Sequence, residues 1–488
     1  RDRTLTSTAD FPLRLVETLK ALYTLELTPA QHSTLQEVKD WCMHRGDGAQ
    51  AVLSGYAGTG KTTLLQILVL ELLSEGLGDE QIWVTAPTHK ATTVLLSKLN
   101  AWKALAMGMI PQPCTVHSAF GLKPKRGLPN EPEAFREGPV RLQRGDLIIV
   151  DECSMVGSEL YRLITEKAKD YECRVLFTGD PKQLQPVNER RVSKTFEVET
   201  QWALTEVLRH GGPVLDLATK VRSMPRGTLP RVRSQVSDSS SVVAYSGVEA
   251  LEDAWGRTLK ASPNDVVFLC WTNKLRRTLN KKAREILYGK DVPDYQEDDK
   301  LLVLRAFERG GQIVMHNNQE VRVKEATLTK VKPLGNKDLE YECWYIKSYS
   351  SGSFYVLTDA EVKKYKADVQ AIGKEVKADN DRLKHEYETV VSLLPNLSRR
   401  ELWNNPNVRE VRQRAEVAKA RWSSEYFALK DFFAEVDFSY AVTIHKSQGS
   451  TFNQVFIADD YMQARDERLQ LLYVAVTRAA NKVHHCEM

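Results

Sequence analysis

The sequence is poor in the features that define secreted and membrane proteins. Its seven cysteines include no C-x-x-C pair, and an odd number of scattered cysteines is typical of free thiols in a reducing compartment. No apolar run approaches the roughly 20 residues that cross a bilayer, and no secretory leader is visible. The chain begins at Arg1 rather than at methionine, so we expect its natural N-terminus to lie upstream. These absences argue against a disulfide-stabilised secreted domain and against an integral membrane protein.

The chain also lacks a strong excess of charge of either sign. Its 68 Lys and Arg residues nearly balance 64 Asp and Glu residues, which leaves a net charge of +4. Bulk charge therefore does not indicate a nucleic-acid partner, and any such site must be a local groove. Hydrophobic residues make up 42% of the chain, which suffices for globular cores. At 488 residues we expect roughly three or four domains.

A phosphate-binding loop is the strongest positive signal. Residues Gly55–Thr62 read G-Y-A-G-T-G-K-T and fit the pattern G-x-x-x-x-G-K-[ST]. A predicted strand, Ala51–Ser54, precedes the loop, and a helix predicted from Lys61 would direct its positive end at the phosphates. Glycines allow the backbone N–H groups to surround those phosphates. The segment therefore predicts that the protein binds a nucleoside triphosphate.

Two further segments supply polar groups at the ends of predicted strands. The apolar run Leu147–Val150 ends in Asp151 and Glu152, where a magnesium ligand and a water-activating base are needed. A second run ends in Gly179 and Asp180, and Gln183 follows it. A glutamine at this edge of a sheet can contact the γ-phosphate or position the attacking water. The three segments together predict hydrolysis of the bound nucleotide.

The pattern of the whole chain predicts an α/β fold with two parallel sheets. In the first half, apolar strand-like runs alternate with helical segments, which is typical of a parallel sheet covered by helices. These strands are predicted at Ala51–Ser54, Gln81–Thr85, Leu147–Val150 and Val175–Thr178. A second alternating block is predicted from segments beginning at Asp265, Tyr440, Gln454 and Leu471.

Two segments interrupt this alternation. Residues 121–145 are rich in Pro, Gly and charge and predict a small hairpin that projects from the first sheet. Residues 286–435 begin with short strands that predict a small β-barrel. They continue with two apolar stripes at helical spacing, separated by Pro395 and Pro406, which predict an antiparallel helical hairpin. Both stripes are interpreted as packing surfaces.

An ordered series of motifs resembles that of superfamily 1 helicases, in particular the phage Dda-type and RecD-like 5′→3′ DNA helicases. In chain order, the segments are the adenine-reading glutamine motif Leu27–Gln31, motif I at Gly55–Thr62, Ia at Ala86–Ala91, Ib at Thr115–Ser118, II at Asp151–Met155, III at Gly179–Val187, IV at Leu204–Arg209, V at Val442–Thr451 and VI at Leu472–Ala479. Segments 121–145 and 286–435 match the family in position and size rather than by motif.

The resemblance implies a domain organisation built on two RecA-like sheets. It comprises a leader helix at 1–25, domain 1A at 26–210 with a pin-like insertion 1B at 121–145, domain 2A at 211–285 and 436–488, and insertion 2B at 286–435. Insertion 2B would hold an SH3-like barrel at about 286–360 and the helical hairpin at about 361–435.

The resemblance also implies a magnesium–ATP site. The catalytic residues would be Lys61, Glu152, Gln183, Arg209 and Arg478; the nucleotide would be bound by Gln31, Gly55, Gly58, Thr59, Gly60, Lys61, Thr62 and Thr63; and Mg²⁺ would be held by Thr62 and Asp151. Arg209 and Arg478 would act as arginine fingers, with a surface salt bridge as the alternative role of Arg209. Because Arg478 comes from the second block, ATP would lie between the two blocks and its hydrolysis would change their spacing.

Single-stranded DNA would lie across both blocks. The implied contacts are Thr88, His89, Lys90, His117, Ser118, Thr443 and His445, whose side chains can contact phosphate or stack on a base. Phe135, on the pin-like segment, would press against the first base pair of the duplex. Packing of Phe135 within its own domain is the alternative.

The leading hypothesis is an ATP-driven 5′→3′ translocase that unwinds duplex DNA. We expect a monomer that binds single strands and duplex junctions and is cytoplasmic or nucleoid-associated, in the host cell if it is a phage protein; replication or repair proteins are candidate partners that the sequence does not specify. A 3′→5′ helicase or an RNA helicase of the same superfamily is the first alternative, because the ATP motifs are nearly the same. A nucleotide-switched binding module, such as a clamp loader or GTPase, leaves motifs V and VI unexplained, and no guanine-selective N-K-x-D sequence is present.

Overall fold

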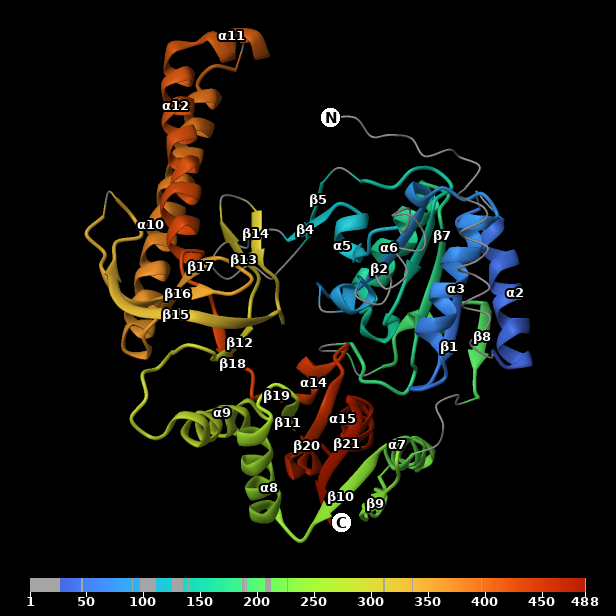
Figure 1. Ribbon diagram of the computed structural model, residues 1–488. Coiled ribbons are helices and arrows are strands. Elements are labelled where there is room, and N and C mark those ends of the chain that lie inside the picture. Colours follow the sequence, from blue (N-terminus) through green and yellow to red (C-terminus); the bar gives the residue numbers. More distant parts are fainter. Residues whose placement is uncertain are drawn as a thin grey trace, which may run out of the picture. The chain divides into compact units, whose positions relative to one another are not determined.

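The computed structural model divides the chain into two compact units, which are described separately (Figure 1). It describes residues 27–44, 47–89, 91–96, 111–124, 135–138, 140–186, 189, 191–206, 212–225, 227–309, 312–335, 337–395 and 397–487. Unit 1 comprises Arg1–Lys123, Arg136–Lys290 and Ser439–Met488, and unit 2 comprises Pro124–Phe135 and Asp291–Phe438. The leader helix predicted over residues 1–25 lies outside the described residues.

The first sheet of unit 1 has six parallel strands in the order β3-β2-β6-β7-β1-β8. Its strands are β1 (Gln50–Gly55), β2 (Ile82–Ala86), β3 (Cys114–Thr115), β6 (Leu147–Val150), β7 (Arg174–Gly179) and β8 (Thr200–Leu204). Every residue of β6 and β7 is buried, as expected for strands covered on both faces. Alternate residues feed two separate apolar cores, with Leu53 in one and Val52 in the other.

Helices cover both faces of this sheet. They are α2 (Pro29–Met43), α3 (Lys61–Ser74), α5 (Val116–Ala119) and α6 (Ser158–Asp170), with 3₁₀ turns at Asp79–Gln81, Cys153–Met155 and Lys194–Phe196. Ten consecutive residues of α3 are buried, so this helix is enclosed by the unit. Strands β4 (Leu122–Pro124) and β5 (Phe135–Glu137) form a separate two-stranded sheet within the segment predicted to be a hairpin.

The second sheet of unit 1 has the order β19-β11-β20-β21-β10-β9 and is parallel except for β9. Its elements are α7 (Pro213–Ser223), β9 (Gln235–Val236), β10 (Ser241–Tyr245), α8 (Val248–Ala261), β11 (Val266–Cys270), α9 (Asn273–Tyr288), β19 (Ala441–Thr443), α14 (Ile444–Ser447), β20 (Phe452–Ile457), a 3₁₀ turn at Asp459–Gln463, α15 (Arg468–Thr477) and β21 (Ala479–Cys486). The apolar segment from Leu471 lies in α15, and strand β21 follows it in the interior of the sheet.

Unit 2 contains an antiparallel sheet in the order β17-β16-β15-β12-β18 and a β13-β14 hairpin. The strands are β12 (Lys300–Val303), β13 (Phe307–Arg309), β14 (Gln312–Met315), β15 (Glu320–Val331), β16 (Tyr341–Ser348), β17 (Ser353–Leu357) and β18 (Val436–Phe438). Side chains of both sheets share one apolar core, which includes Leu301, Phe307 and Phe354.

A helical hairpin makes up the rest of unit 2. It consists of α10 (Asp359–Ser392), α11 (Arg399–Asn404), α12 (Pro406–Arg421), a π-helical turn at Trp422–Phe427 and α13 (Ala428–Lys430). Pro406 occupies the first turn of α12, where its missing N–H has no intrahelical partner to lose. Helices α10 and α12 lie side by side (Figure 1). None of the described helices is long and apolar enough to span a bilayer.

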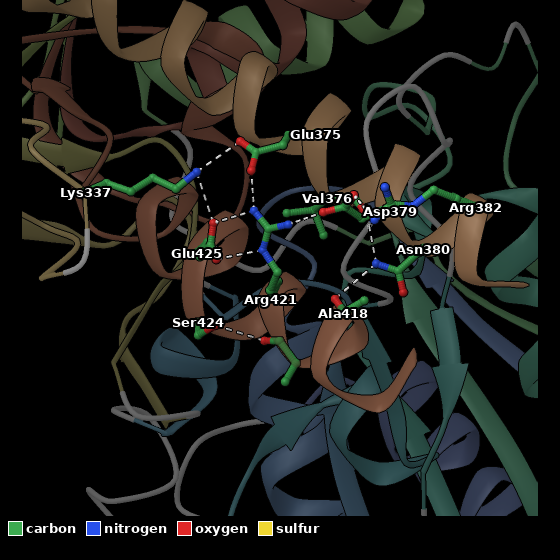
Figure 2. A network of polar contacts seen from close by, with 11 residues as sticks. Lys337, Glu375, Val376, Asp379, Asn380, Arg382, Ala418, Arg421, Ser424 and Glu425 are labelled. Carbon is green, nitrogen blue, oxygen red and sulfur yellow. Dashed lines mark hydrogen bonds and ion pairs between the residues drawn. The ribbon is translucent and has the colours of Figure 1, made fainter. Parts of the chain in front are cut away.

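A charged network joins the two long helices (Figure 2). Arg421 forms ion pairs with Glu375 and Asp379 of α10. It also pairs, at 2.8 Å, with Glu425 of the π-helical turn that follows α12. Lys337 pairs with the same Glu375 and Glu425 at 3.0 and 3.1 Å. The predicted fold class, an α/β protein with two parallel sheets and inserted segments, is confirmed.

Candidate nucleotide site

The loop Gly55–Thr62 connects β1 to α3 and owes its shape to its glycines. Gly58 and Gly60 have φ angles of +85° and +81°, in the left-handed region that side chains disfavour. A Cβ atom on Gly55 would lie 2.7 Å from Thr59 Oγ1. Thr59 is buried, and its N–H and hydroxyl both donate to the Tyr56 carbonyl, at 3.2 and 2.8 Å. The result is a tight loop that ends at a helix N-terminus, the arrangement that binds phosphates.

Lys61, Thr62 and Thr63 occupy the first turn of α3 and are half-buried. The Lys61 ammonium donates to the carbonyl oxygens of Gly55 and of Tyr56, the latter at 3.1 Å. Its positive charge is thereby held against the loop. This is where the charge must lie to neutralise phosphates that the loop binds.

Gln31 reaches the same loop from α2. Its side-chain nitrogen donates to the Thr59 carbonyl at 3.0 Å, and its side-chain oxygen accepts from the Thr28 N–H at 3.0 Å, within a capping box. The side chain is 2% exposed. Gln31 therefore ties the start of α2 to the phosphate-binding loop, in addition to the predicted contact with a base.

Asp151 and Glu152 follow β6 at the carboxyl edge of the first sheet. The Thr178 hydroxyl donates to Asp151 Oδ1 at 2.5 Å, which fixes the orientation of this carboxylate. Glu152 has a φ of +54°, a conformation that costs a non-glycine residue about 1–3 kcal/mol and occurs at functional sites. Burial and the neighbouring Asp151 raise the pKa of Glu152, while Arg478 and Lys61 oppose that shift.

Gln183 lies beyond β7 and is 7% exposed. Among the described residues, its Oε1 atom has no hydrogen-bond partner. Leaving a buried amide oxygen unpaired costs about 1–3 kcal/mol, so such an atom indicates a partner that comes from outside the chain. A water or a phosphate bound beside the sheet edge would satisfy it.

Arg478 brings the second sheet to this site at the end of α15. It is 6% exposed, and it donates to the Val474 and Ser450 carbonyls at 3.3 Å and to the Thr477 hydroxyl at 3.2 Å. No carboxylate of the described chain lies within ion-pair distance of it. Burial lowers the pKa of Arg478, and the charge of Glu152 opposes that shift. A buried guanidinium bonded only to neutral oxygens is suited to receive an anion.

Motif V contributes two polar groups to which the sequence analysis gave no role. Gln448 and Ser450 are 8% and 5% exposed. Within the described part of the chain, the atoms Gln448 Nε2 and Ser450 Oγ have no partner. The polar Gln-Gly-Ser run directly follows the short helix α14 and was visible in the sequence, but its burial was not.

Equivalent threonine-capped turns stand at one edge strand of each sheet. Thr115, the last residue of β3, accepts the Ser118 N–H at 3.2 Å, and Thr443, the last residue of β19, accepts the Lys446 N–H at 3.3 Å. The second residue of each turn is a half-buried histidine, His117 or His445. Burial lowers the pKa of both, so they are neutral near pH 7. They can bond to or stack on a nucleic acid but add no charge.

The remaining predicted DNA contacts are placed unequally. Thr88 and His89 are half-buried at the end of β2, and Thr88 Oγ1 accepts the Ala91 N–H at 3.2 Å. Ser118 is exposed. Phe135 begins strand β5, but the position of its side chain lies outside what the structure describes, as do Lys90 and Arg209.

The donor set near the loop fits magnesium. In the described residues, no group of three or more His, Cys, Asp or Glu side chains could hold a metal. Magnesium at a phosphate-binding loop requires fewer protein ligands, because the phosphates and waters supply the rest. One hydroxyl and one carboxylate, Thr62 and Asp151, therefore suffice chemically; Thr62 lies in the first turn of α3, and Asp151 directly follows β6 at the same edge of the sheet.

Two family models and several curated proteins are similar to this chain. Residues 26–242 match the model of an AAA domain, and residues 438–484 match that of a UvrD-like helicase C-terminal domain. The chain is 27% identical over 454 residues to the ATP-dependent DNA helicase dda of Enterobacteria phage T4, covering 89% of this chain and 93% of that protein. It is 26% identical over 460 residues to the RecBCD enzyme subunit RecD of Mycobacterium tuberculosis, covering 88% and 65%.

Solved structures that align with most of this chain include Pif1 helicases. The Candida albicans Pif1 structure aligns over 95% of both chains with 16% identity and a TM-score of 0.43. A Bacteroides Pif1 in complex with ADP-AlF3 and single-stranded DNA aligns over 93% of this chain and 92% of that chain, with 15% identity and a TM-score of 0.45.

Proposed function

We propose that this chain, a superfamily 1 DNA helicase of the Dda- and RecD-like group, hydrolyses ATP between its two parallel sheets and moves 5′→3′ along single-stranded DNA. The main support is that charged residues carried by the two sheets lie near one another. Lys61 and Glu152 belong to the first sheet, and Arg478 reaches the electrostatic range of Glu152 from the second.

The proposed chemistry assigns one task to each group. Lys61 and the N–H groups of the loop bind the β- and γ-phosphates, and Glu152 polarises the attacking water. Gln183 bonds to that water or to the γ-phosphate through its unpaired oxygen. Arg478 stabilises the charge that develops on the transferred phosphoryl group.

A bound Mg²⁺, held by Thr62 and Asp151, would neutralise charge between the phosphates. Thr178 keeps the Asp151 carboxylate oriented for that contact through its 2.5 Å hydrogen bond. The cofactor assignment is therefore ATP with magnesium.

The domain assignment follows from the same division. We assign the two sheets of unit 1 to RecA-like domains 1A and 2A, and the Asp291–Phe438 part of unit 2 to insertion 2B, with residues 121–145 kept as insertion 1B. The threonine-capped turns at Thr115 and Thr443 give each domain one contact with the DNA strand. Because ATP lies between the domains, hydrolysis would change the distance between these contacts and so move the strand.

The direction of movement rests on the Dda-like sequences of motifs Ia, III and V. It is tested by unwinding of duplexes that carry either a 5′ or a 3′ single-stranded tail. We expect unwinding of the 5′-tailed substrate with ATP and magnesium, and none with Lys61→Ala. Unwinding of the 3′-tailed substrate alone would reverse the assignment. An RNA tail in a third substrate tests the RNA helicase alternative.

A further inference from the structure

Helix α15 contacts the phosphate-binding loop through a tyrosine that no role above requires. The Tyr473 hydroxyl accepts the Ala57 N–H at 3.1 Å and donates to Asp180 Oδ2 at 2.6 Å. Tyr473 is 2% exposed and Asp180 is fully buried. A single hydroxyl of the second sheet's helix thus bonds to two nucleotide-binding segments of the first sheet.

The surroundings of Asp180 show that this bond is specific. The other carboxylate oxygen, Oδ1, accepts the Lys182 N–H at 2.9 Å, so Tyr473 is the donor to the remaining oxygen. Burial and the charge of Asp180 raise the pKa of Tyr473, which keeps the hydroxyl protonated. A phenylalanine would fill the same space but would leave both Ala57 N–H and Asp180 Oδ2 without this partner.

A second contact reaches the adjacent residue of the loop. The Arg222 guanidinium of α7 lies 3.9 Å from the ring centroid of Tyr56, within the range of a cation–π interaction. Helix α7 packs against α15, so two neighbouring helices of the second sheet contact consecutive loop residues, Tyr56 and Ala57. The phosphate-binding pattern allows any residue at these two positions. The residues at these two positions can therefore make contacts other than phosphate binding.

The position of Tyr473 on α15 gives the contact a consequence. Arg478 follows it by five residues, about 7.5 Å along a helix axis. Because a helix transmits displacement along its axis, fixing Tyr473 on the loop fixes where the Arg478 guanidinium lies. We propose that Tyr473, supported by the Arg222–Tyr56 contact, is a positioning residue for ATP hydrolysis that sets the reach of Arg478 to the γ-phosphate.

This inference rests on the arginine-finger role proposed for Arg478 and deepens it. It predicts that Tyr473 acts on the rate of hydrolysis through another residue, rather than by touching ATP. Removal of the Tyr473 hydroxyl should therefore lower kcat more than it changes KM for ATP. This effect should also disappear in a variant that lacks the Arg478 guanidinium.

The test is a double-mutant cycle on single-strand-stimulated ATPase. We expect Tyr473→Phe to lower kcat by about 10- to 100-fold, as for loss of a charge-assisted hydrogen bond, with KM changed by less than about twofold. In the Arg478→Ala background the same change should have little further effect, because the two residues act as a unit. Arg222→Gln should lower kcat less, and Arg222→Lys should restore it.

A matched control removes the same kind of bond from the other unit. The buried Tyr341 donates to Asp368 Oδ2 at 2.7 Å, and Tyr341→Phe should lower the thermal midpoint while leaving kcat unchanged. Multiplicative losses in the Tyr473–Arg478 cycle would overturn the inference, as would a Tyr473→Phe variant with wild-type kcat. If Tyr473→Phe does not fold, Arg222→Gln, at a half-buried position, replaces it in the double-mutant cycle with Arg478→Ala. Failure of the proposed direction would appear separately, in the tailed-duplex assay with the wild-type protein.

Discussion

Polar side chains are paired differently at the nucleotide site and in the ion-pair network around Arg421 in the helical hairpin. At the site, Gln183 Oε1, Gln448 Nε2 and Ser450 Oγ are buried and have no partner among the described residues. In the hairpin, Arg421 forms ion pairs with three acidic side chains, two of which Lys337 shares (Figure 2). The two regions come from different units of the chain and differ in what their polar groups are for.

The difference separates polar groups that serve a ligand from polar groups that serve the fold. An unpaired buried group costs about 1–3 kcal/mol, which a ligand that bonds to it offsets, and at the nucleotide site such a ligand is proposed. A paired group costs less and fixes the geometry of the elements it joins. Substitutions at the nucleotide site should therefore affect the reaction and spare stability, whereas substitutions in the hairpin network should do the reverse.

Lys61→Ala should give the largest change. Its ammonium donates to two loop carbonyls and lies at a half-buried position, so its removal should abolish ATP hydrolysis while leaving the thermal midpoint unchanged. Turnover of ATP is measured in the presence of single-stranded DNA, with a thermal melt alongside. Wild-type turnover in the purified variant would remove Lys61 from the site.

Arg478→Ala should slow hydrolysis by ~10³–10⁵, the contribution of an arginine finger, and weaken ATP binding far less. Single-turnover hydrolysis and a binding titration separate the two quantities. Arg414→Ala, which breaks an exposed ion pair with Glu386 in the hairpin, is the matched control. If Arg478→Ala turned over ATP at close to the normal rate, the two sheets would not form a shared site.

Glu152→Gln should reduce turnover by ~10²–10⁴, because it removes a general base and keeps the magnesium ligand Asp151. The variant should bind ATP and retain it unhydrolysed. Retention is measured by filtration of the complex with labelled ATP. Loss of nucleotide binding would contradict the role given to Glu152.

Arg421→Ala should reverse the pattern, losing about 1–2 kcal/mol of stability with ATPase unchanged, since its ion pairs are partly exposed and screened. Arg421 lowers the pKa of Glu375 and Glu425 below the usual 4.5. Their stabilising effect is therefore present above about pH 4.5 and is lost as the pH falls through the lowered values.

Denaturant unfolding of unit 2, followed at neutral and acidic pH, measures this effect. The difference in free energy of unfolding between wild type and Arg421→Ala should become smaller in acid. Arg382→Ala, which breaks one exposed pair with Asp379, should cost less than about 0.5 kcal/mol. A drop in ATPase for Arg421→Ala with unchanged stability would show that the hairpin network serves the reaction.

The smallest expected effect concerns pH and DNA binding. Affinity for single strands should fall with salt, by a slope of about −0.7 per phosphate contacted. Burial lowers the pKa of His117 and His445 below 6.5, although Glu467 partly opposes this at His445. The salt slope should therefore stay the same between about pH 8 and about pH 6.5. A steeper slope at the lower pH would mean that these histidines bind DNA as cations.

Much of the site could be predicted because its signals are local. The loop Gly55–Thr62 needs glycine at the positions where the structure has positive φ, and lysine next to the helix start. Asp151 and Glu152 follow a fully apolar run, so their place at the end of a buried strand was predictable. Parallel strands bring such ends to one edge, and the confirmed fold class followed from their alternation with helices.

Other features depend on residues far apart in the chain. The order of the strands, the insertion of β21 between β20 and β10, and the strained backbone of Glu152 leave no local pattern. The bond from Tyr473 to Asp180 joins residues 293 positions apart. The sequence alone predicts nucleotide chemistry, because phosphate binding needs particular residues at short spacing. Which polar groups meet and which stay unpaired depends on the packed fold, because burial and long-range pairing arise when the sheets and helices come together.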